Sequence, residues 1–449
     1  MKKIIETIKN ISSIKELRDK LLLTLGLMAI YRFAAQVTLP GLDATVIANA
    51  MQGQGNNGGL LDLANMFTGG GFLRASLMAL GVMPYISASI VVQLMGIAIP
   101  YLQKLQSDGE SGRKKITQIT RWLTIGITLV QGPAYIANLT AVGIPEEAFI
   151  IGQGGLFWFT SLVLLTTGSI FAMWLGERIT DKGIGNGISL LIMIGIIAGF
   201  PGAFVQELNS KTTDGGAGGF MVILIEVIIW FAVILASVYL VTAVRRVAVQ
   251  YARKTVAGNV TNVAGARQYI PLKLNSAGVM PIIFAQAIMF VPSAIEQASF
   301  SSEGVKSVAG LFSDFNGWGY NILFATLIIV FSYFYTAITV KTNEMAASLK
   351  RSNGFIPGIR PGQETDNYLD KILSLITFPG SIFLALLAVL PAIVVNFNVQ
   401  QSWAMFYGGT SLIIMVGVAI DTIQQINAHL LNRHYDGLMK TGTKRKSLA

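Results

Sequence analysis

The sequence has no cysteine, few charged residues and only two histidines. Without cysteine the chain forms no disulfide, has no thiolate metal ligand and has no catalytic thiol. Charged residues make up 12% of the 449 residues and hydrophobic residues 53%, whereas soluble domains carry about 25% charged residues. This composition excludes a disordered chain and argues against a soluble enzyme of several domains, which could not hide so much apolar surface. We therefore expect a protein that crosses the membrane several times.

Long apolar segments predict an all-α polytopic membrane protein with ten transmembrane helices. A spanning helix needs about 20 mainly apolar residues. The polar segment 1–20 does not resemble a signal peptide, so we expect the first span to stay in the membrane. The predicted spans are 21–38, 76–100, 121–142, 154–176, 184–203, 220–243, 275–297, 319–340, 372–396 and 407–428.

The basic residues gather on one face of this predicted topology. Ten spans place both termini on the same side, and 29 of the 33 basic residues then lie on that face. With the acidic residues included, the formal charges are about +17 on this face and about −6 on the opposite one. The positive-inside rule therefore predicts that both termini are cytoplasmic.

A short internal repeat suggests two related halves. The tetrapeptide Gly-Val-Met-Pro occurs at 81–84 and again at 278–281, each time near the start of the second span of a five-span half. Halves of five spans have opposite orientations, as in an inverted repeat, which places function at the interface between the halves. Chance repetition in so biased a composition explains one tetrapeptide about as well.

A segment before the second span is apolar but too short to cross a bilayer. Leu60, Leu63, Ala64 and Phe67 are spaced to form one helix face, and three glycines follow at 69–71. One interpretation is an interfacial helix on the outer surface. The other is a re-entrant helix that fills a cavity between the halves and can swing away.

No pattern indicates enzyme or nucleotide chemistry. The glycine-rich stretch 181–187 follows no strand and leads into a span, so it predicts a tight turn. The two histidines, in a tail we expect to be solvated, have no metal-ligand cluster around them, and no nucleophile–base pair is recognisable. We therefore expect no cofactor, no metal and no catalytic residue.

The ionisable residues inside the spans, Arg32, Glu226 and Asp421, all fall toward span ends. An ion-coupled secondary transporter with inverted repeats usually has at least one charge near the midplane, so this placement disfavours that class. Ion channels carry charged rings or carbonyl filters, and neither is apparent. A protein-conducting channel and an intramembrane insertase or enzyme without a through-pore are the other classes considered.

Two long basic loops on the cytosolic face suggest a docking surface. Loop 244–273 contains no acidic residue and has β-prone stretches such as 260–263. Loop 341–371 contains the sequence Pro357–Gly362, in which prolines and glycines on both sides of Arg360 predict a stiff turn that presents this side chain. Such loops suit an acidic or phosphate-bearing partner, although positive-inside retention alone explains the sign of the charge.

Four motifs resemble those of the bacterial SecY family of protein-translocation channels. The resemblance runs from about residue 20 to residue 440. The motifs are LGVMPYISASI at 80–90, GESGR at 109–113, WLGERITDKGIGNGIS at 174–189 and PGIRPG at 357–362.

The resemblance implies an hourglass pore between two inverted five-helix halves, 21–203 and 220–428. Unfolded secretory chains would thread through it, and signal anchors and membrane-protein helices would leave sideways into lipid. A plug helix at 60–72 would fill the outer funnel. A ring of aliphatic side chains would close the waist, and position 82 is valine here where the family usually has isoleucine.

The resemblance also assigns residues to these parts. The pore ring falls on Val82, Ile86, Ile192, Ile283 and Ile414. The plug comprises Leu60, Leu61, Leu63, Ala64, Met66, Phe67, Gly69 and Gly70. The lateral gate, between spans 2–3 and 7–8, includes Ser87 and Gln131, although ordinary interhelical hydrogen bonds explain both equally well.

The family's partners follow from the same resemblance. The loops 244–273 and 341–371 would dock the SecA motor ATPase and the ribosome, with Arg360 the most important residue. SecE would clamp both halves, SecG would lie at the periphery, and the energy source would act in trans. Segments 1–20 and 429–449 would be a cytosolic N-terminal segment and a cytosolic basic tail. The absence of a transit peptide favours a bacterial inner membrane over a plastid thylakoid. The docking residues are Arg245, Arg246, Arg253, Lys254, Lys350, Arg351 and Arg360.

Overall fold

The structure divides the chain into two compact units. It is a computed structural model, which describes residues 14–47, 65–137, 139, 145–150, 152, 154–214, 219–251, 268–297, 310, 312, 315 and 317–445. Unit 1 contains the described residues up to Gln206 and those from Val418 onward, and unit 2 contains those from Glu207 to Gly417. Both boundaries fall inside continuous helices.

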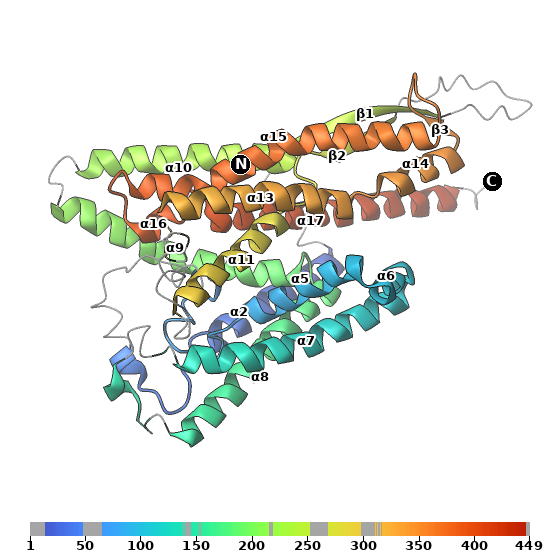
Figure 1. Ribbon diagram of the computed structural model, residues 1–449. Helices are drawn as coiled ribbons and strands as arrows, with labels where there is room; N and C mark the ends of the chain where they lie inside the picture. The colour runs from blue at the N-terminus through green and yellow to red at the C-terminus, as the bar shows by residue number, and fades with distance from the viewer. Residues whose placement is uncertain are drawn as a thin grey trace, which may run out of the picture. The chain divides into compact units, whose positions relative to one another are not determined.

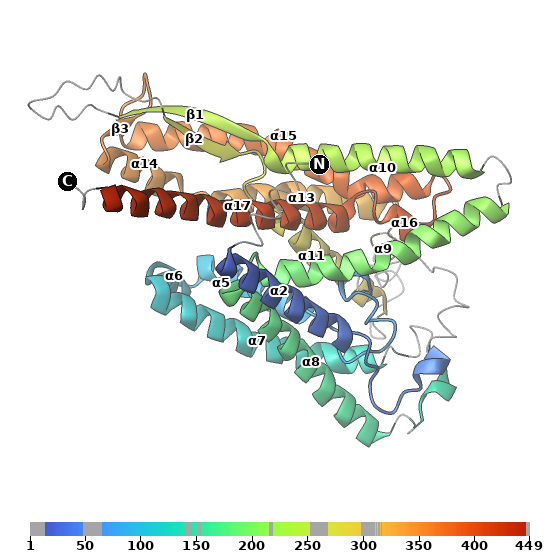
Figure 2. The same ribbon diagram turned by 180° about the vertical axis from the view of Figure 1, so that it is seen from behind.

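Unit 1 is helical. In Figure 2, α2 runs beside α8, and α5 packs against α7. A core formed by residues 39–47, the 75–80 turn, the C-terminal end of α7 and the N-terminal end of α8 includes Leu39, Ala75 and Phe157, each at most 1% exposed. Its elements are α2 (Lys15–Ala34), α5 (Met83–Ala98), α6 (Pro100–Ser107), α7 (Gly109–Ala137), the 3-10 helix η1 (Glu146–Ala148), α8 (Gly155–Lys182), the first part of α9 (Gly187–Asp214) and the last part of α17 (Gly409–Arg445).

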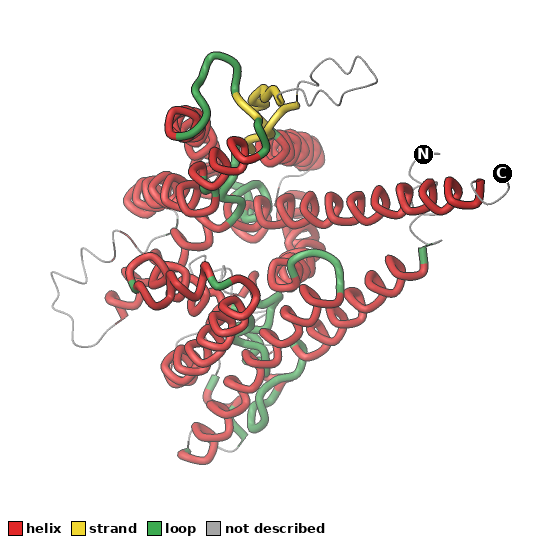
Figure 3. The backbone as a smooth tube through the Cα atoms, turned by 90° about the vertical axis from the view of Figure 1, so that its right-hand side faces the viewer, coloured by secondary structure: helices red, strands yellow, loops and turns green. Residues whose placement is uncertain are grey.

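Unit 2 combines long helices with a small sheet. Figure 1 shows α13 and α15 side by side, and the strands, yellow in Figure 3, lie together. The sheet order is β2-β1-β3, with β1 antiparallel to both neighbours. The elements are the rest of α9 and α17, α10 (Gly219–Thr242), β1 (Val244–Tyr251), β2 (Gln268–Lys273), α11 (Met280–Gln297), α13 (Trp318–Thr339), α14 (Thr342–Arg351), β3 (Gly354–Phe355), α15 (Gln363–Val395) and α16 (Gln401–Ala404).

The helices do not coincide with the predicted spans. Residues 76–82 of the predicted second span form turns, because Gly81 has a φ of +53°, which a helix does not admit. The following helices α5 and α6 meet at Pro100 with a bend of 106°. Conversely, α15 begins at Gln363, well before residue 372, because hydropathy detects the apolar part of a helix and not its polar continuation.

Within the described residues, six helices are long and apolar enough to cross a membrane, and the bent α5–α6 pair adds a seventh. Every predicted span overlaps a helix of the structure. The helices α2, α7 and α11 do not meet the same criteria of length and composition. The multi-pass membrane protein is thus confirmed, whereas the count of ten spans stays a prediction.

The surface of α10 is that of a helix in lipid. It exposes Phe220, Ile228 and Leu235 by 66%, 59% and 68%, respectively. So large an exposed apolar surface is unfavourable in water and suits hydrocarbon.

Candidate pore, plug and docking surface

The end of the predicted plug segment lies against α2 and α9. Arg32, near the end of α2, donates a hydrogen bond from Nη1 to the carbonyl oxygen of Gly69 at 2.9 Å. On the other side, a methyl group at Gly195 of α9 would lie 2.8 Å from the Phe67 carbonyl oxygen, so the two backbones are in direct contact. Gly69 itself has a φ of +66°, a conformation that glycine adopts without strain.

Local hydrogen bonds connect the same segment to residues 72 and 73, which precede α5, and these residues in turn to α7. The Oδ1 of Asn65 accepts from the Leu73 amide at 3.1 Å, and the Thr68 hydroxyl accepts from the Phe72 amide at 3.0 Å. The Tyr135 hydroxyl of α7 donates to the Phe72 carbonyl oxygen at 2.6 Å. Residues 65–82 therefore form a well-connected turn between the plug end and α5.

The predicted pore-ring residues of unit 1 lie next to this turn. Val82 is the residue immediately before α5 and is 4% exposed, and its carbonyl oxygen accepts from the Ile86 amide at 3.1 Å, which puts the two residues one helical turn apart. Ile192 on α9 is 3% exposed and lies three residues before Gly195, on the same face of the helix. The plug end thus contacts α9 one turn beyond a predicted ring residue.

The remaining ring residues belong to unit 2. Ile283 lies on α11 and is half-buried, and Ile414 lies on α17 and is 1% exposed. Because the ring members are divided between the two units, their assembly into one constriction stays a prediction.

The repeated tetrapeptide has the same local structure in both units. In each copy the glycine has a positive φ, +53° at Gly81 and +65° at Gly278. In each copy the helix begins at the methionine, Met83 of α5 or Met280 of α11. The repeat is therefore structural as well as sequential at these two helix starts.

The two predicted docking loops fold into a single body of unit 2, which we call the docking body. It comprises β1, β2, β3, α14 and the first turns of α15. Its core joins Val249 of β1, Leu349 of α14 and Leu369 of α15, which are 1%, 7% and 0% exposed. The loops are thus not independent, because each supplies part of one hydrophobic core.

The turn around Arg360 is held at both ends. Ile356, 4% exposed, and Ile359 pack against the core of the docking body, and the Ile359 amide donates to the Ile356 carbonyl oxygen at 3.1 Å. Gly358 and Gly362 have φ values of +83° and +113°. The Arg360 side chain is exposed, as the proline and glycine pattern predicts.

The other predicted site residues are exposed, half-buried or outside the described part of the chain. Arg245 and Arg246 on β1 and Lys350 and Arg351 at the end of α14 are exposed. Ser87 on α5 is half-buried, and Gln131 on α7 is exposed. Met66, Phe67, Gly69 and Gly70 belong to the plug end described above. Residues that lie outside the described part of the chain are Leu60, Leu61, Leu63, Ala64, Arg253, Lys254 and the stretch 260–263.

Sequence reasoning missed two residues of this site. The sequence shows Arg32 near a span end and names no partner for it, although a lone basic residue inside an apolar span is a signal for a specific acceptor. Gly195 carries no signal in one sequence, because only the close approach of the Phe67 carbonyl shows why a side chain is excluded. Within the described ranges, no group of three acidic or histidine side chains could hold a metal ion.

Comparison with known proteins decides the family. The family model SecY matches residues 76–423. The chain belongs to the SecY family. It is similar to the protein translocase subunit SecY of Streptomyces scabiei, with 38% identity over 432 residues that cover 95% of this chain and 97% of the relative.

Solved structures show the same fold. A protein-conducting channel superposes with a TM-score of 0.64 at 18% identity, covering 91% of each chain. Sec61 in the canine ribosome-channel complex from the endoplasmic reticulum superposes with a TM-score of 0.61 at 19% identity, again over 91% of each chain. As a member of this family, the chain is a channel subunit of a protein translocase and not an enzyme.

Proposed function

We propose that the chain is the channel subunit of a bacterial inner-membrane translocon that moves unfolded secretory chains outward and releases signal anchors and membrane-protein helices sideways into lipid. The observation that carries the proposal is the contact between the plug end and α9, one turn beyond Ile192. A turn that rests on α9, beside the aliphatic side chain of Ile192, is suited to seal a resting pore and to move away when a polypeptide enters.

Aliphatic closure explains how such a pore blocks ions without any charged filter. Val82, Ile86 and Ile192 offer no hydrogen bond to water, and a narrow apolar constriction excludes ions by dewetting. Flexible aliphatic side chains can also yield around a moving chain of any sequence. Ser87 and Gln131 are the residues we assign to the lateral gate.

The docking body supports the proposal that SecA or the ribosome drives transport in trans. Arg245, Arg246, Lys350, Arg351 and Arg360 are exposed on one folded body, so their charges keep fixed positions. A fixed basic surface attracts acidic or phosphate-bearing partners and steers their approach. The ribosome-bound Sec61 structure has the same fold, which supports a ribosome partner here. We propose SecE and SecG as the membrane partners and a cytoplasmic position for both termini.

Reconstitution tests this function. The chain is purified with SecE and SecG, placed in vesicles, and supplied with SecA, ATP and a secretory precursor. We expect the precursor to become protected from external protease only when ATP and SecA are both present. Protection without SecA, or none with all components present, would contradict the proposal. Ribosome–nascent-chain complexes replace SecA in the parallel arm.

A further inference from the structure

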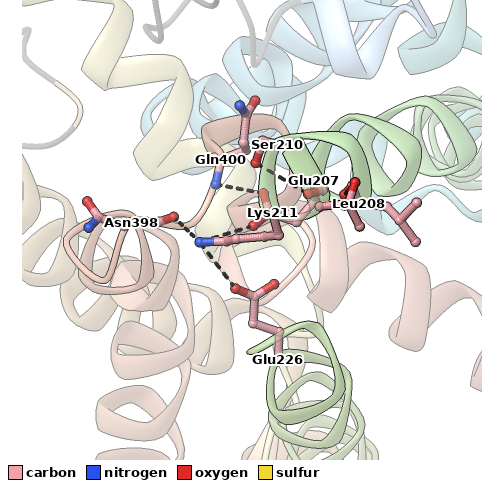
Figure 4. A network of polar contacts seen from close by, with 8 residues as sticks. Glu207, Leu208, Ser210, Lys211, Glu226, Asn398 and Gln400 are labelled. Carbon is pink, nitrogen blue, oxygen red and sulfur yellow. Dashed lines mark hydrogen bonds and ion pairs between the residues drawn. The ribbon is translucent and has the colours of Figure 1, made fainter. Parts of the chain in front are cut away.

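A buried cluster of charges in unit 2 has no role in the function proposed above. Glu207 and Lys211 lie one turn apart on α9, and Glu226 projects from α10 toward them (Figure 4). The Lys211 Nζ lies 3.7 Å from the Glu207 Oε1 and 3.8 Å from the Glu226 Oε1. It also donates a hydrogen bond to the Asn398 carbonyl oxygen at 2.6 Å.

The charges in this cluster do not balance. The side chains of Glu207, Glu226 and Lys211 are only 2%, 8% and 17% exposed. Two carboxylates facing one ammonium leave a formal charge of −1 in a site almost closed to water. Burying an uncompensated charge is unfavourable, so a site of this kind favours an occupant that neutralises the excess charge.

The hydrogen bonds show which carboxylate oxygens of the cluster lack a donor. The Glu207 Oε2 accepts the Gln400 amide at 2.8 Å. In contrast, neither carboxylate oxygen of Glu226, nor the Glu207 Oε1, accepts a hydrogen bond from any residue that the structure describes. The ionisable groups acting on Glu226 are Glu207 and Lys211 from α9 and the phenol of Tyr407, which is also buried and brings no positive charge.

We propose that the cluster is a proton-binding site, in which one proton on Glu226 faces Glu207 and fastens the end of α9 to α10. With the proton bound, the three side chains are neutral as a group and Lys211 can hold both carboxylates and Asn398 together. When the proton leaves to water, the cluster gains its negative charge and these contacts weaken.

The position of the cluster gives the proton a mechanical consequence. The boundary between the two units falls between Gln206 and Glu207, immediately before the cluster. The contacts of Glu207 and Lys211 with Glu226, Asn398 and Gln400 all lie within unit 2. The proton therefore strengthens the contacts of the last turns of α9 with α10 and with residues 398–400, all of which lie within unit 2.

Thermal unfolding across a pH series tests the site in the purified membrane complex. Above about pH 4–5, where glutamate in the unfolded chain is ionised, we expect the wild type to lose stability as pH rises until the bound proton has left, because its folded state holds a proton that the unfolded chain releases. Glu226→Gln imitates the protonated carboxyl. We expect it to remove this pH dependence and to unfold about 2–4 °C or more above the wild type at the alkaline end.

Further variants separate the proton from a simple ion pair. Glu207→Gln leaves one carboxylate with Lys211, so it should also lose the pH dependence. Lys211→Met leaves two carboxylates without a cation and should lose stability most steeply as pH rises. Glu344→Gln is the matched control, since its pair with Lys341 in the same unit is exposed, and it should keep the wild-type profile.

Three results would overturn the proposal. The first is a flat wild-type profile together with a Glu226→Gln variant that is less stable at every pH. The second is restoration of alkaline stability by sodium but not by choline, which would make the occupant a metal cation. The third result comes from the wild type alone and does not depend on the variants. With ¹³C-labelled glutamate, we expect its infrared spectrum to show a protonated carboxyl band at neutral pH that disappears at alkaline pH. Absence of that band rejects the site even if the variants fail to assemble.

Discussion

The guanidinium of Arg32 holds the backbone of Gly69 through a 2.9 Å hydrogen bond, and this joins the first helix to the end of the plug segment. Because this hydrogen bond has a charged donor and one specific carbonyl acceptor, it fixes the position of the plug end relative to α2. The contact links the only basic residue within the predicted first span to the segment that we propose to seal the pore.

Replacing Arg32 with methionine should make the resting channel leak. A hydrogen bond from a charged donor contributes about 1.5–3 kcal/mol, and 1.4 kcal/mol is a factor of ten in a population. We therefore expect the displaced plug to be roughly ten-fold or more enriched, and the ion conductance of channel-containing bilayers to rise with it. Arg18→Met is the control, because Arg18 lies on the same helix but is exposed and pairs with Asp19. Equal conductance of the two variants would contradict the proposal that Arg32 holds the plug end in place.

Adding one methyl group at Gly195 should have a similar effect by a steric route. In Gly195→Ala the new carbon would lie 2.8 Å from the Phe67 carbonyl oxygen, so the plug end must shift away from α9. We expect raised ion conductance and faster cysteine labelling of an introduced Phe67→Cys side chain. Gly202→Ala on the same helix meets no atom within 4 Å and should behave as the wild type. Unchanged labelling in Gly195→Ala would show that the plug end is not seated there.

Reversing the charge at Arg360 should impair export without affecting assembly. The exposed arginine lies in a turn anchored by Ile356 and Ile359, so Arg360→Glu changes the docking surface and leaves the core intact. We expect SecA-driven translocation to fall at least ten-fold while the complex with the membrane partners forms normally. Lys114→Glu, an exposed charge reversal on α7, serves as the comparison. Export at the wild-type rate would reject the docking role of Arg360.

The substitution Leu369→Ala tests whether the two docking segments act as one body. The side chain is fully buried between α15 and the sheet, and its removal should destabilise the docking body by about 2–5 kcal/mol. We expect faster tryptic cleavage within the docking body and weaker SecA binding although no charge is altered. Leu375→Ala on the same helix removes a side chain that is 65% exposed and should change neither property. Unchanged SecA binding together with increased tryptic cleavage would show that docking does not depend on the fold of this body.

Local features of this site were predictable from the sequence, and long-range contacts were not. The Pro357–Gly362 turn follows from backbone restrictions of proline and glycine, which act within a few residues. The apolar spans likewise follow from composition along one segment. By contrast, β1 joins α14 and α15 in one core through residues about a hundred positions away in the sequence, and no local pattern specifies this contact.

The start of α5 shows how a misjudged boundary arises. Residues 76–82 are apolar enough to extend a predicted span, but the positive φ of Gly81 and the close packing of Thr68 against it require a turn. Hydropathy measures solubility in lipid and does not measure backbone conformation. The same glycine before Met280 confirms that this turn is a property of the repeated tetrapeptide.

Crosslinking to a polypeptide in transit tests the central claim most directly. A photo-reactive amino acid is placed singly at positions 82, 86, 192, 283 and 414, and at 235 on the exposed face of α10 as a control. A secretory chain stalled during translocation should crosslink to all five ring positions and not to position 235. Crosslinks that are missing from the ring, or equally strong at position 235, would contradict a path for polypeptide through this ring.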